Sequence, residues 1–306
     1  MAPGCSRDQA VGPSRGLEPR RPPAIAIPPP PEVSVLVVVW WLGCVPRPGA
    51  VPDGQRCAIE GTERWCVHET VKLELGPLAH RSVHFQLPLG EPPVAGWPVA
   101  LLFQGSFYPA SRTWAADRGG PFGAWYQTET VEALLDAGWA VITPDTQGSG
   151  HTFWNTNVVP WSLDWESAPD HALMQTLLAE LEAGTFGPLD PQRLSAAGIS
   201  SGGYMTSRMA LSYPGRFERL AIQSASWATC SGPLCVLPGE LPDDHPPTLF
   251  LHGERDDVVP IETMERYRDR LEADGHRVSS IIDPEAGHAW LPDAPEAIVA
   301  WFADAG

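Results

Sequence analysis

The stretch LSAAGISSGGYMTSRMAL, from Leu194 to Leu211, decides the fold. It contains a G-x-S-x-G pattern, Gly198 to Gly202, between an apolar run that predicts a strand and a run that predicts a helix. At such a junction the pattern is typical of a nucleophile elbow, in which glycines permit a sharp turn that raises a serine hydroxyl above the sheet at a helix N-terminus. We therefore predict that Ser200 is a nucleophile. The alternative is a glycine-rich turn without chemistry.

Strand-like and helix-like runs alternate along the chain from about Val71. This alternation is typical of an α/β domain with a mostly parallel central sheet flanked by helices. Several strand candidates are continuously apolar, as expected of strands that helices cover on both faces. No internal repeat and no second domain can be recognised from this pattern, so we predict a single catalytic domain. The predicted strands are Val83–Leu87, Val99–Phe103, Trp139–Thr143, Leu194–Gly198, Leu220–Gln223, Thr248–His252 and Val278–Ile282, and the predicted helices are Tyr126–Leu135, His171–Leu181, Tyr204–Leu211, Glu262–Leu271 and Ala294–Phe302.

A serine nucleophile needs a base that takes its proton and a carboxylate that orients the base. After a nucleophile elbow the order along the chain is serine, acid, histidine. Asp256 follows a late predicted strand and is the predicted acid, with Asp257 as the alternative; either could instead cap the next helix. His288 follows the last predicted strand and is the predicted base. His252 is interpreted as a structural residue and His276 as a solvated one.

An oxyanion that develops during acyl transfer needs two fixed backbone N–H donors. The first predicted donor is Ser201, immediately after the nucleophile. The second is Ser106, in the glycine-containing loop that follows the predicted strand ending at Phe103. An ordinary turn that merely needs its glycine is the alternative for this loop.

The aromatic residues supply the candidates for substrate contact. Most of the 13 Trp are expected to pack in or near the core. A long aromatic-rich connection runs from Thr146 to Pro169, and connections of this length are usually functional or mobile. The predicted substrate contacts lie in this connection, after the elbow helix, beside the base and in the oxyanion loop: Trp154, Trp161, Trp165, Trp227, Trp290 and Phe107.

The N-terminal residues 1–50 are predicted to be a proline-rich tail followed by an export segment, and residues 51–306 a catalytic domain. Residues 1–32 lack apolar periodicity, which predicts disorder. The apolar run Val33–Leu42 is too short to span a membrane but has the length of a signal-peptide core. Its ending resembles a bacterial lipoprotein signal, in which Cys44 would be lipidated. Ordinary secretion and a buried strand are the alternatives.

The net charge and the cysteine content limit which molecules and metals the protein could bind. With 20 Lys and Arg against 37 Asp and Glu, the net charge of −17 disfavours nucleic acid. Two close cysteine pairs, Cys57 with Cys66 and Cys230 with Cys235, suit local disulfides in an oxidising compartment, with buried thiols as the alternative. Their spacing does not favour a metal site. We expect neither a metal nor a cofactor.

Longer blocks of the sequence resemble the extracellular medium-chain-length polyhydroxyalkanoate depolymerases, serine esterases of the α/β-hydrolase fold. The resemblance spans about Leu101 to Phe302. It implies that Ser200, Asp256 and His288 form a triad, that Cys230 and Cys235 belong to a family segment, and that the substrates are polyesters of 3-hydroxy acids with medium-length side chains. The blocks are LFQGSFYP (Leu102–Pro109), GISSGGYMTSRMA (Gly198–Ala210), SASWATCSGPLC (Ser224–Cys235), HPPTLFLHGERD (His245–Asp256) and GHAW (Gly287–Trp290).

Related short-chain enzymes carry a separate polymer-binding domain. Here we expect the polymer to adsorb on the catalytic domain through exposed apolar side chains. The expected protein is thus an esterase that is secreted or lipid-anchored at the cell envelope. The alternatives are a carboxylesterase or lipase for smaller or emulsified esters, a broader polyesterase, a peptidase of the same fold, and a catalytically silent binding protein.

Overall fold

The computed structural model describes residues 51–76, 79–231 and 234–304. The predicted export segment, including Cys44, lies outside these residues, so the domain boundary at residue 51 stays a prediction. Within the described part of the chain, no helix has the length and apolarity needed to cross a membrane.

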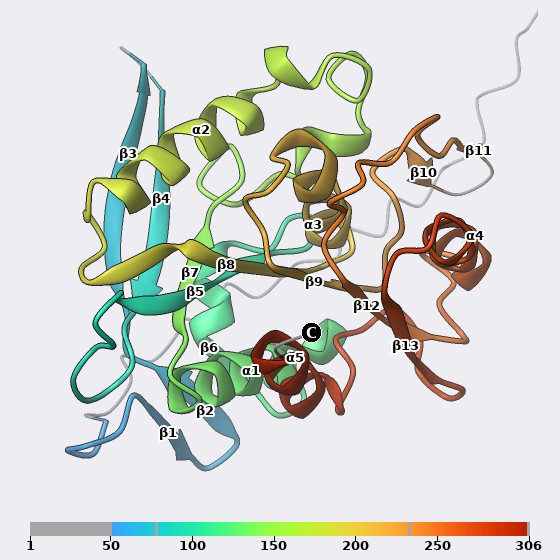
Figure 1. Ribbon diagram of the computed structural model, residues 1–306. Coiled ribbons are helices and arrows are strands. Elements are labelled where there is room, and N and C mark those ends of the chain that lie inside the picture. The colour runs from blue at the N-terminus through green and yellow to red at the C-terminus, as the bar shows by residue number, and fades with distance from the viewer. Residues whose placement is uncertain (1–50, 77–78, 232–233, 305–306) are drawn as a thin grey trace, which may run out of the picture. The chain divides into compact units, whose positions relative to one another are not determined.

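The centre of the molecule is an eight-stranded sheet with the order β13-β12-β9-β8-β5-β7-β4-β3 (Figure 1). Neighbouring strands from β13 to β7 are parallel, and β4 and β3 continue the sheet in antiparallel pairing. The fold is the predicted α/β architecture with a mostly parallel sheet. The strands are β3 (Glu69–Gly76), β4 (Ala79–Gln86), β5 (Trp97–Phe103), β7 (Ala140–Pro144), β8 (Leu189–Ile199), β9 (Arg219–Gln223), β12 (Thr248–Gly253) and β13 (Val278–Asp283).

Helices cover both faces of this sheet (Figure 1). One face packs against α2, α3 and α4, and the other against α1 and α5. Successive side chains of β5 alternate between the two cores: Leu101 and Phe103 face α2 and α3, whereas Leu102 faces α1 and α5. The helices are α1 (Ala124–Asp136), α2 (Pro169–Glu182), α3 (Ser201–Ser212), α4 (Ile261–Ala273) and α5 (Ala294–Ala303).

All seven strands and five helices predicted from the sequence are present, with bounds that differ at their ends. β8 begins at Leu189, five positions before the predicted start at Leu194, because its first residues pair with Trp97 ahead of a register shift in β5. The antiparallel strand β3 and the small sheets described next were not predicted. They lie outside the repeating strand-helix pattern on which the prediction depended.

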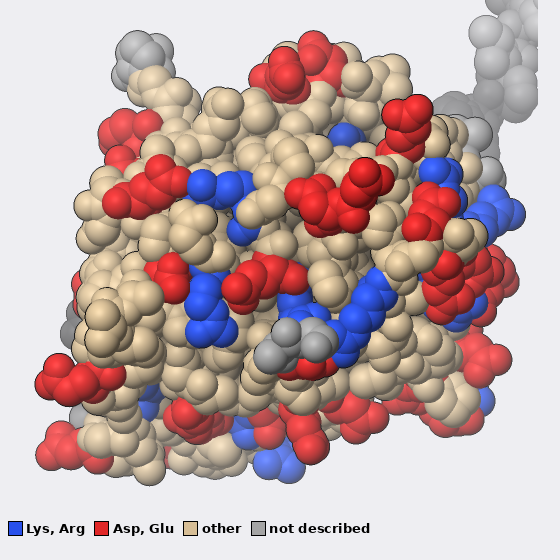
Figure 2. Space-filling model, in the orientation of Figure 1, with Lys and Arg blue, Asp and Glu red and all other residues tan. Residues whose placement is uncertain are grey.

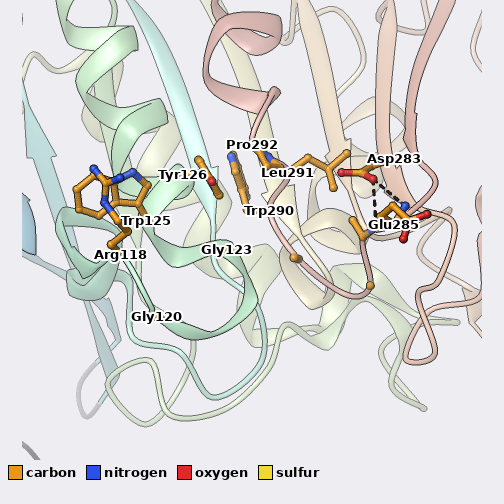
Figure 3. Close-up of a pocket in the computed structure, with 13 residues that line it drawn as sticks. Arg118, Gly120, Gly123, Trp125, Tyr126, Asp283, Glu285, Trp290, Leu291 and Pro292 are labelled. Atoms are coloured by element: carbon orange, nitrogen blue, oxygen red, sulfur yellow. Dashed lines mark hydrogen bonds between the residues drawn. The ribbon is translucent and has the colours of Figure 1, made fainter. Parts of the chain in front are cut away.

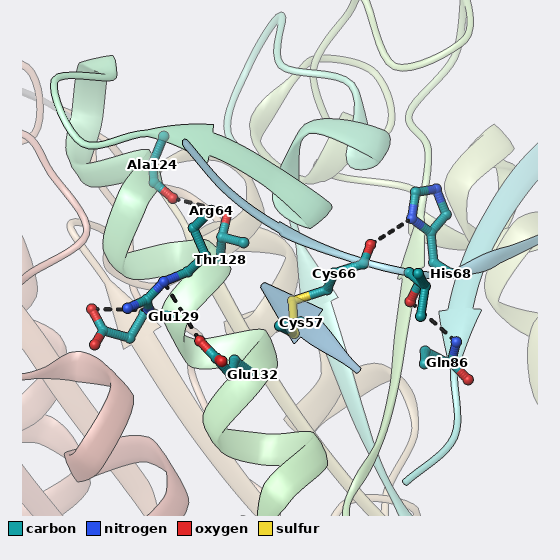
Figure 4. Close-up of a disulfide and its surroundings, with 10 residues drawn as sticks. Cys57, Arg64, Cys66, His68, Gln86, Ala124, Thr128, Glu129 and Glu132 are labelled. Carbon is teal, nitrogen blue, oxygen red and sulfur yellow. Dashed lines mark hydrogen bonds and ion pairs between the residues drawn. A yellow bond between two sulfur atoms is a disulfide. The ribbon is translucent and has the colours of Figure 1, made fainter. Parts of the chain in front are cut away.

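A three-stranded sheet of β1 (Cys57–Glu60), β2 (Glu63–Cys66) and β6 (Ala115–Asp117) packs against α1. A disulfide joins Cys57 to Cys66, which lie opposite each other in the β1-β2 pair (Figure 4). Arg64 of β2 reaches Glu129 at 3.2 Å and Glu132 at 3.5 Å on α1. The disulfide ties β1 to β2 within this sheet, and the ion pairs of Arg64 hold the sheet on the helix.

A second disulfide joins Cys230 to Cys235 across the short hairpin of β10 (Cys230–Ser231) and β11 (Leu234–Cys235). Both predicted disulfides are therefore confirmed. Closing loops of this size contributes about 2 to 3 kcal/mol each in the chain-entropy model.

The long connection between β7 and α2 is irregular except for two single-turn helices, Asn155–Asn157 and Trp165–Ser167. It is anchored at several points. The Asp170 carboxylate accepts the backbone N–H of Asn155 at 2.7 Å, and the Arg208 guanidinium donates to the carbonyl oxygens of Thr156 and Ser162. Burial raises the pKa of Asp170 to about 6. The connection is therefore held against the helices beneath it.

The acidity found in the composition appears on the surface. Figure 2 shows Asp and Glu side chains spread over one face, with Lys and Arg among them.

Candidate active site

The predicted elbow lies at the C-terminal end of β8, a central strand between β5 and β9. Ser200 follows the strand directly and adopts φ 55° and ψ −122°. Such a conformation costs a non-glycine residue about 1 to 3 kcal/mol. Two backbone hydrogen bonds hold it: the Ser200 N–H donates to Gln223 O at 3.0 Å, and Ser200 O accepts the N–H of Tyr204 at 3.0 Å. The turn leaves Ser200 half-buried at the start of α3.

The glycines of the elbow are required by close backbone contacts. A Cβ atom at Gly202 would lie 2.1 Å from Phe103 O, at the end of β5. A Cβ at Gly198 would lie 2.3 Å from Gly202 O. The elbow thus packs directly on the strand that leads into the predicted oxyanion loop, and no side chain fits at either glycine.

Asp256 and His288 are brought together by the ends of β12 and β13. His288 Nδ1 donates to Asp256 Oδ2 at 2.8 Å, and the Asp256 side chain is fully buried. Asp256 Oδ1 accepts the N–H groups of Val258 and Val259 at 2.9 and 2.8 Å. Burial alone would raise the pKa of Asp256, but the hydrogen bonds from His288 and Val259 outweigh it and lower the pKa below its ordinary value. The carboxylate is therefore ionised while it holds the imidazole.

The alternative acid and the other histidines are placed differently. Asp257 is exposed. His252 is buried, and its Nε2 donates to Val259 O at 2.9 Å and lies 3.4 Å from Asp256 Oδ2. Burial lowers the pKa of His252, so this imidazole stays neutral beside the carboxylate. His276 is half-buried, with its ring 5.2 Å from that of His245.

The predicted oxyanion loop lies against the elbow. A side chain at Gly105 would meet the Cβ of Ser200 at 3.7 Å. The loop is held from beneath, because Gln104 O accepts the indole N–H of Trp154 at 2.9 Å and Gln104 Oε1 accepts the amide of Gln127 at 3.0 Å. Ser106, the predicted second donor, is exposed at this loop.

Trp154 also ties the loop to the elbow. Its backbone N–H donates to Ser201 Oγ at 2.9 Å. Ser201, the predicted first donor, is itself buried. One fully buried tryptophan therefore contacts both segments that carry the predicted oxyanion donors.

The predicted substrate-contacting tryptophans are mostly packing residues. Trp154, Trp227 and Trp290 are 0%, 3% and 1% exposed, which leaves almost no ring surface for a substrate. Trp165 is also buried, and Trp161 is half-buried against the core on the α2 side. Phe107, in contrast, is 66% exposed next to Ser106. Among these residues, Phe107 is the one that offers an open aromatic surface.

Two exposed aromatic residues at the site were not predicted: Phe122 and Phe153. The Phe122 ring lies 6.0 Å from the His288 ring, and the Phe153 ring lies 6.2 Å from the Phe107 ring. Phe153 belongs to the long aromatic-rich connection, which the sequence predicted to be either functional or mobile. Phe122 lies in the glycine-rich segment Arg118–Gly123, which carried no motif.

A cavity of about 410 Å³, whose lining residues are drawn in Figure 3, borders the loop that carries His288. Gly287 and Ala289, on either side of His288, line it, but His288 itself does not. Arg118 and Trp125 border the cavity on the side of α1, and Asp283 and Glu285 on the side of β13. Within the described ranges, no three metal-ligating side chains converge, here or elsewhere.

An elbow serine, a buried carboxylate–histidine pair and this sheet order define a serine hydrolase of the α/β-hydrolase fold, a class that includes esterases and peptidases. The chain is 45% identical over 247 residues to the poly(3-hydroxyoctanoate) depolymerase of Pseudomonas fluorescens, a match that covers 81% of this chain and 88% of that protein. The chain belongs to the polyhydroxyalkanoate depolymerase family, which confirms the resemblance inferred from the sequence blocks.

Other similarities are more distant. Residues 239–305 match the prolyl oligopeptidase family. The S-formylglutathione hydrolase of Staphylococcus aureus has a TM-score of 0.53 at 15% identity and covers 78% of this chain and 99% of its own. The acylaminoacyl peptidase of Pyrococcus horikoshii has a TM-score of 0.52 at 14% identity and covers 77% and 40%. These two structures support the fold alone.

Proposed function

We propose that the protein hydrolyses the ester bonds of medium-chain-length poly(3-hydroxyalkanoates) through an acyl-enzyme on Ser200. The observation that carries the proposal is the 2.8 Å hydrogen bond between His288 and Asp256, in a chain 45% identical to a poly(3-hydroxyoctanoate) depolymerase. No metal or cofactor takes part in the proposed chemistry.

The first half-reaction forms the acyl-enzyme. Because His288 Nδ1 donates to Asp256, Nε2 is free to accept the proton of the Ser200 hydroxyl. The serine oxygen attacks the ester carbonyl carbon. The N–H groups of Ser201 and Ser106 stabilise the resulting oxyanion. When the carbon–oxygen bond to the alcohol breaks, His288 returns its proton to the leaving oxygen.

The second half-reaction releases the acid. Water takes the position of the alcohol, His288 removes its proton, and the resulting oxygen attacks the acyl carbon. Collapse of the intermediate returns the proton to Ser200 and frees a carboxylic acid. Ionised Asp256 stabilises the imidazolium in both halves.

The test is clearing of a poly(3-hydroxyoctanoate) latex, combined with turnover of p-nitrophenyl esters. We expect Ser200→Ala to abolish both activities while it unfolds at the same denaturant concentration as wild type. Ser212→Ala, at the other end of α3, is the matched control and should retain activity. Retained turnover in purified Ser200→Ala would contradict the nucleophile. Turnover of soluble esters by wild type without any clearing of the latex would contradict the substrate class.

The two disulfides support export to an oxidising compartment, in secreted or lipid-anchored form. Lipidation of Cys44 is tested by labelling expressing cells with a radioactive fatty acid. Label that is found in wild type and lost in Cys44→Ser would support an anchor. Wild type without label would favour a freely secreted enzyme.

A further inference from the structure

The phenylalanines of this protein fall into two groups. Of the nine, all within the described residues, six are buried at 6% exposure or less. The other three are Phe107, Phe122 and Phe153, at 66%, 56% and 37% exposure. Phe122 lies beside His288, and Phe107 and Phe153 lie at the predicted oxyanion loop. An exposed apolar ring costs free energy in water, so its concentration at one place points to a contact made with something else.

Phe107 and Phe122 are also held in strained backbone. Their φ angles are 61° and 56°, a region that bulky residues rarely adopt. The Phe107 N–H donates to Thr152 O at 2.7 Å, and Phe122 O accepts the N–H of Trp290 at 2.9 Å. Glycine would fit both positions without strain. The chain instead carries a large apolar side chain at each, and strain of this kind concentrates at functional sites.

The three rings form two walls, one beside the triad histidine and one at the predicted oxyanion loop. The histidine wall is Phe122, whose ring meets the His288 ring at 6.0 Å and 77°. The oxyanion wall is Phe107 with Phe153, whose rings meet at 6.2 Å and 89°. Phe107 follows Ser106, and Phe153 precedes Trp154, which binds Ser201 Oγ. The walls are therefore attached to different catalytic loops.

The chemistry of ester hydrolysis places a different part of the substrate next to each wall. The leaving oxygen must lie next to the histidine that protonates it, and the carbonyl oxygen must lie in the oxyanion hole. The alcohol part of the substrate thus lies toward His288. The acyl chain begins on the carbon that carries the oxyanion, so its first carbons lie within reach of side chains on the loop of Ser106, on the side away from the leaving alcohol. In a poly(3-hydroxyalkanoate), both parts carry an alkyl side chain.

We propose that the histidine wall binds the alkyl side chain of the alcohol-side repeat unit and the oxyanion wall binds that of the acyl-side unit. The inference rests on the proposed function and adds the residues that determine specificity on each side of the scissile bond. The two walls together would hold an apolar polyester chain with its ester bond at Ser200.

Two ester series test the two walls separately. One series fixes the butanoate acyl group and compares octyl with ethyl as the alcohol. The other fixes p-nitrophenol and compares octanoate with acetate. For Phe122→Ala we expect the octyl-to-ethyl ratio of kcat/KM to fall about tenfold, mainly through KM, because a hydrophobic contact of this size discriminates by one to two orders of magnitude. The octanoate-to-acetate ratio should stay within about twofold of wild type.

For Phe107→Ala we expect the octanoate-to-acetate ratio to fall about tenfold and the octyl-to-ethyl ratio to stay within about twofold of wild type. Phe122→Tyr and Phe107→Tyr keep an aromatic ring, so both ratios should equal those of wild type in these two variants. Each ratio compares two substrates on the same variant. A general loss of activity from a displaced His288 or oxyanion loop lowers kcat/KM for both substrates and therefore leaves the ratio unchanged. The control is Val94→Ala, an exposed apolar residue ahead of β5 and thus at the opposite end of that strand from the site; both its ratios should equal those of wild type.

The proposal is overturned if neither ratio changes in the alanine variants, or if both ratios fall equally in each. This outcome is separate from that of the polymer assay, because soluble esters report the walls even if wild type does not clear the latex. Failure of the latex assay contradicts the proposed polymer substrate, and unchanged ester ratios contradict the walls.

Discussion

The indole N–H of Trp154 donates to the carbonyl oxygen of Gln104 at 2.9 Å, from a side chain that is 0% exposed. This bond fixes the strand end from which the predicted oxyanion loop departs. The backbone N–H of the same tryptophan donates to Ser201 Oγ. Trp154 is thus a positioning residue, because it orients two segments that would contact the substrate while remaining out of its reach.

Trp154→Phe should therefore lower kcat more than it raises KM. It keeps a buried aromatic ring but removes the donor to Gln104 O, so the loop can shift away from the oxyanion. We expect kcat to fall about tenfold or more, since small displacements of catalytic groups are costly. The control is Trp65→Phe, because the buried Trp65 Nε1 has no hydrogen-bond partner among the described residues. Equal effects in the two variants would show that only packing is at stake.

Asp256→Asn should reduce kcat by about 10³- to 10⁴-fold with little loss of stability. An asparagine amide would favour the wrong tautomer of His288 and could not stabilise the imidazolium. The neighbouring Asp257 is exposed, so Asp257→Asn serves as the matched control and should retain activity. Steady-state turnover of p-nitrophenyl octanoate measures both variants, and inactivation by Asp257→Asn would reverse the assignment of the acid.

Phe122→Gly should unfold at a higher denaturant concentration than Phe122→Ala. Both variants remove the ring, but only glycine adopts a φ of 56° freely. We expect a difference in the free energy of unfolding of about 1 kcal/mol in favour of glycine. Equilibrium urea unfolding provides the comparison. If the alanine variant is the more stable, the strain attributed to this position is absent.

His245 should make the protein sensitive to acid. Burial, with a smaller contribution from His276, lowers its pKa from 6.5 to about 4, whereas the hydrogen bond to Pro246 O and the charge of Asp244 oppose this shift. A neutral His245 accepts the hydroxyl of Tyr267 through Nε2 and donates through Nδ1 to Pro246 O, both at 2.9 Å. Because the unfolded chain takes up a proton near pH 6.5 and the folded chain only near pH 4, the stability from this group is complete above pH 6.5 and is lost as the pH falls to about 4.

The loss should amount to about 3 kcal/mol over that interval. It is measured as the difference between wild type and His245→Gln in urea unfolding at several pH values, since glutamine cannot take up the proton. The difference cancels other groups, including Asp170, whose raised pKa acts with the opposite sign. Parallel pH profiles for the two proteins would refute the assignment.

The sequence predicted the parts of the site that depend on local pattern and chain order. The G-x-S-x-G pattern between a strand and a helix predicted the elbow at Ser200, and strand-end positions predicted that Asp256 and His288 would meet. The parallel sheet places these strand ends at one edge, so their order in the chain is sufficient. Two adjacent acids could not be separated by pattern, and it is the burial of Asp256 and the exposure of Asp257 that distinguish them.

The aromatic residues could not be placed in the same way. Trp154 lies in a connection without periodicity, so nothing local indicates that its ring turns inward onto Gln104. Phe122 is fixed by a hydrogen bond from Trp290, which is distant in the chain. Its positive φ is a tertiary effect that a Pro-Phe-Gly segment does not encode by itself.

Glycine contacts join both catalytic loops to their surroundings. Besides Gly202 on Phe103 O, a Cβ at Gly123 would lie 2.1 Å from Trp290 O. At both joints, backbone meets backbone, and the exposed rings of Phe107, Phe122 and Phe153 do not take part. If the walls bind the substrate as proposed, substrate preference can be changed at these three side chains while the backbone contacts at Gly202 and Gly123 stay intact. A library of variants limited to these three positions would test new polyester substrates with little loss of stability. A side chain at Gly202 or Gly123, in contrast, would collide with backbone atoms.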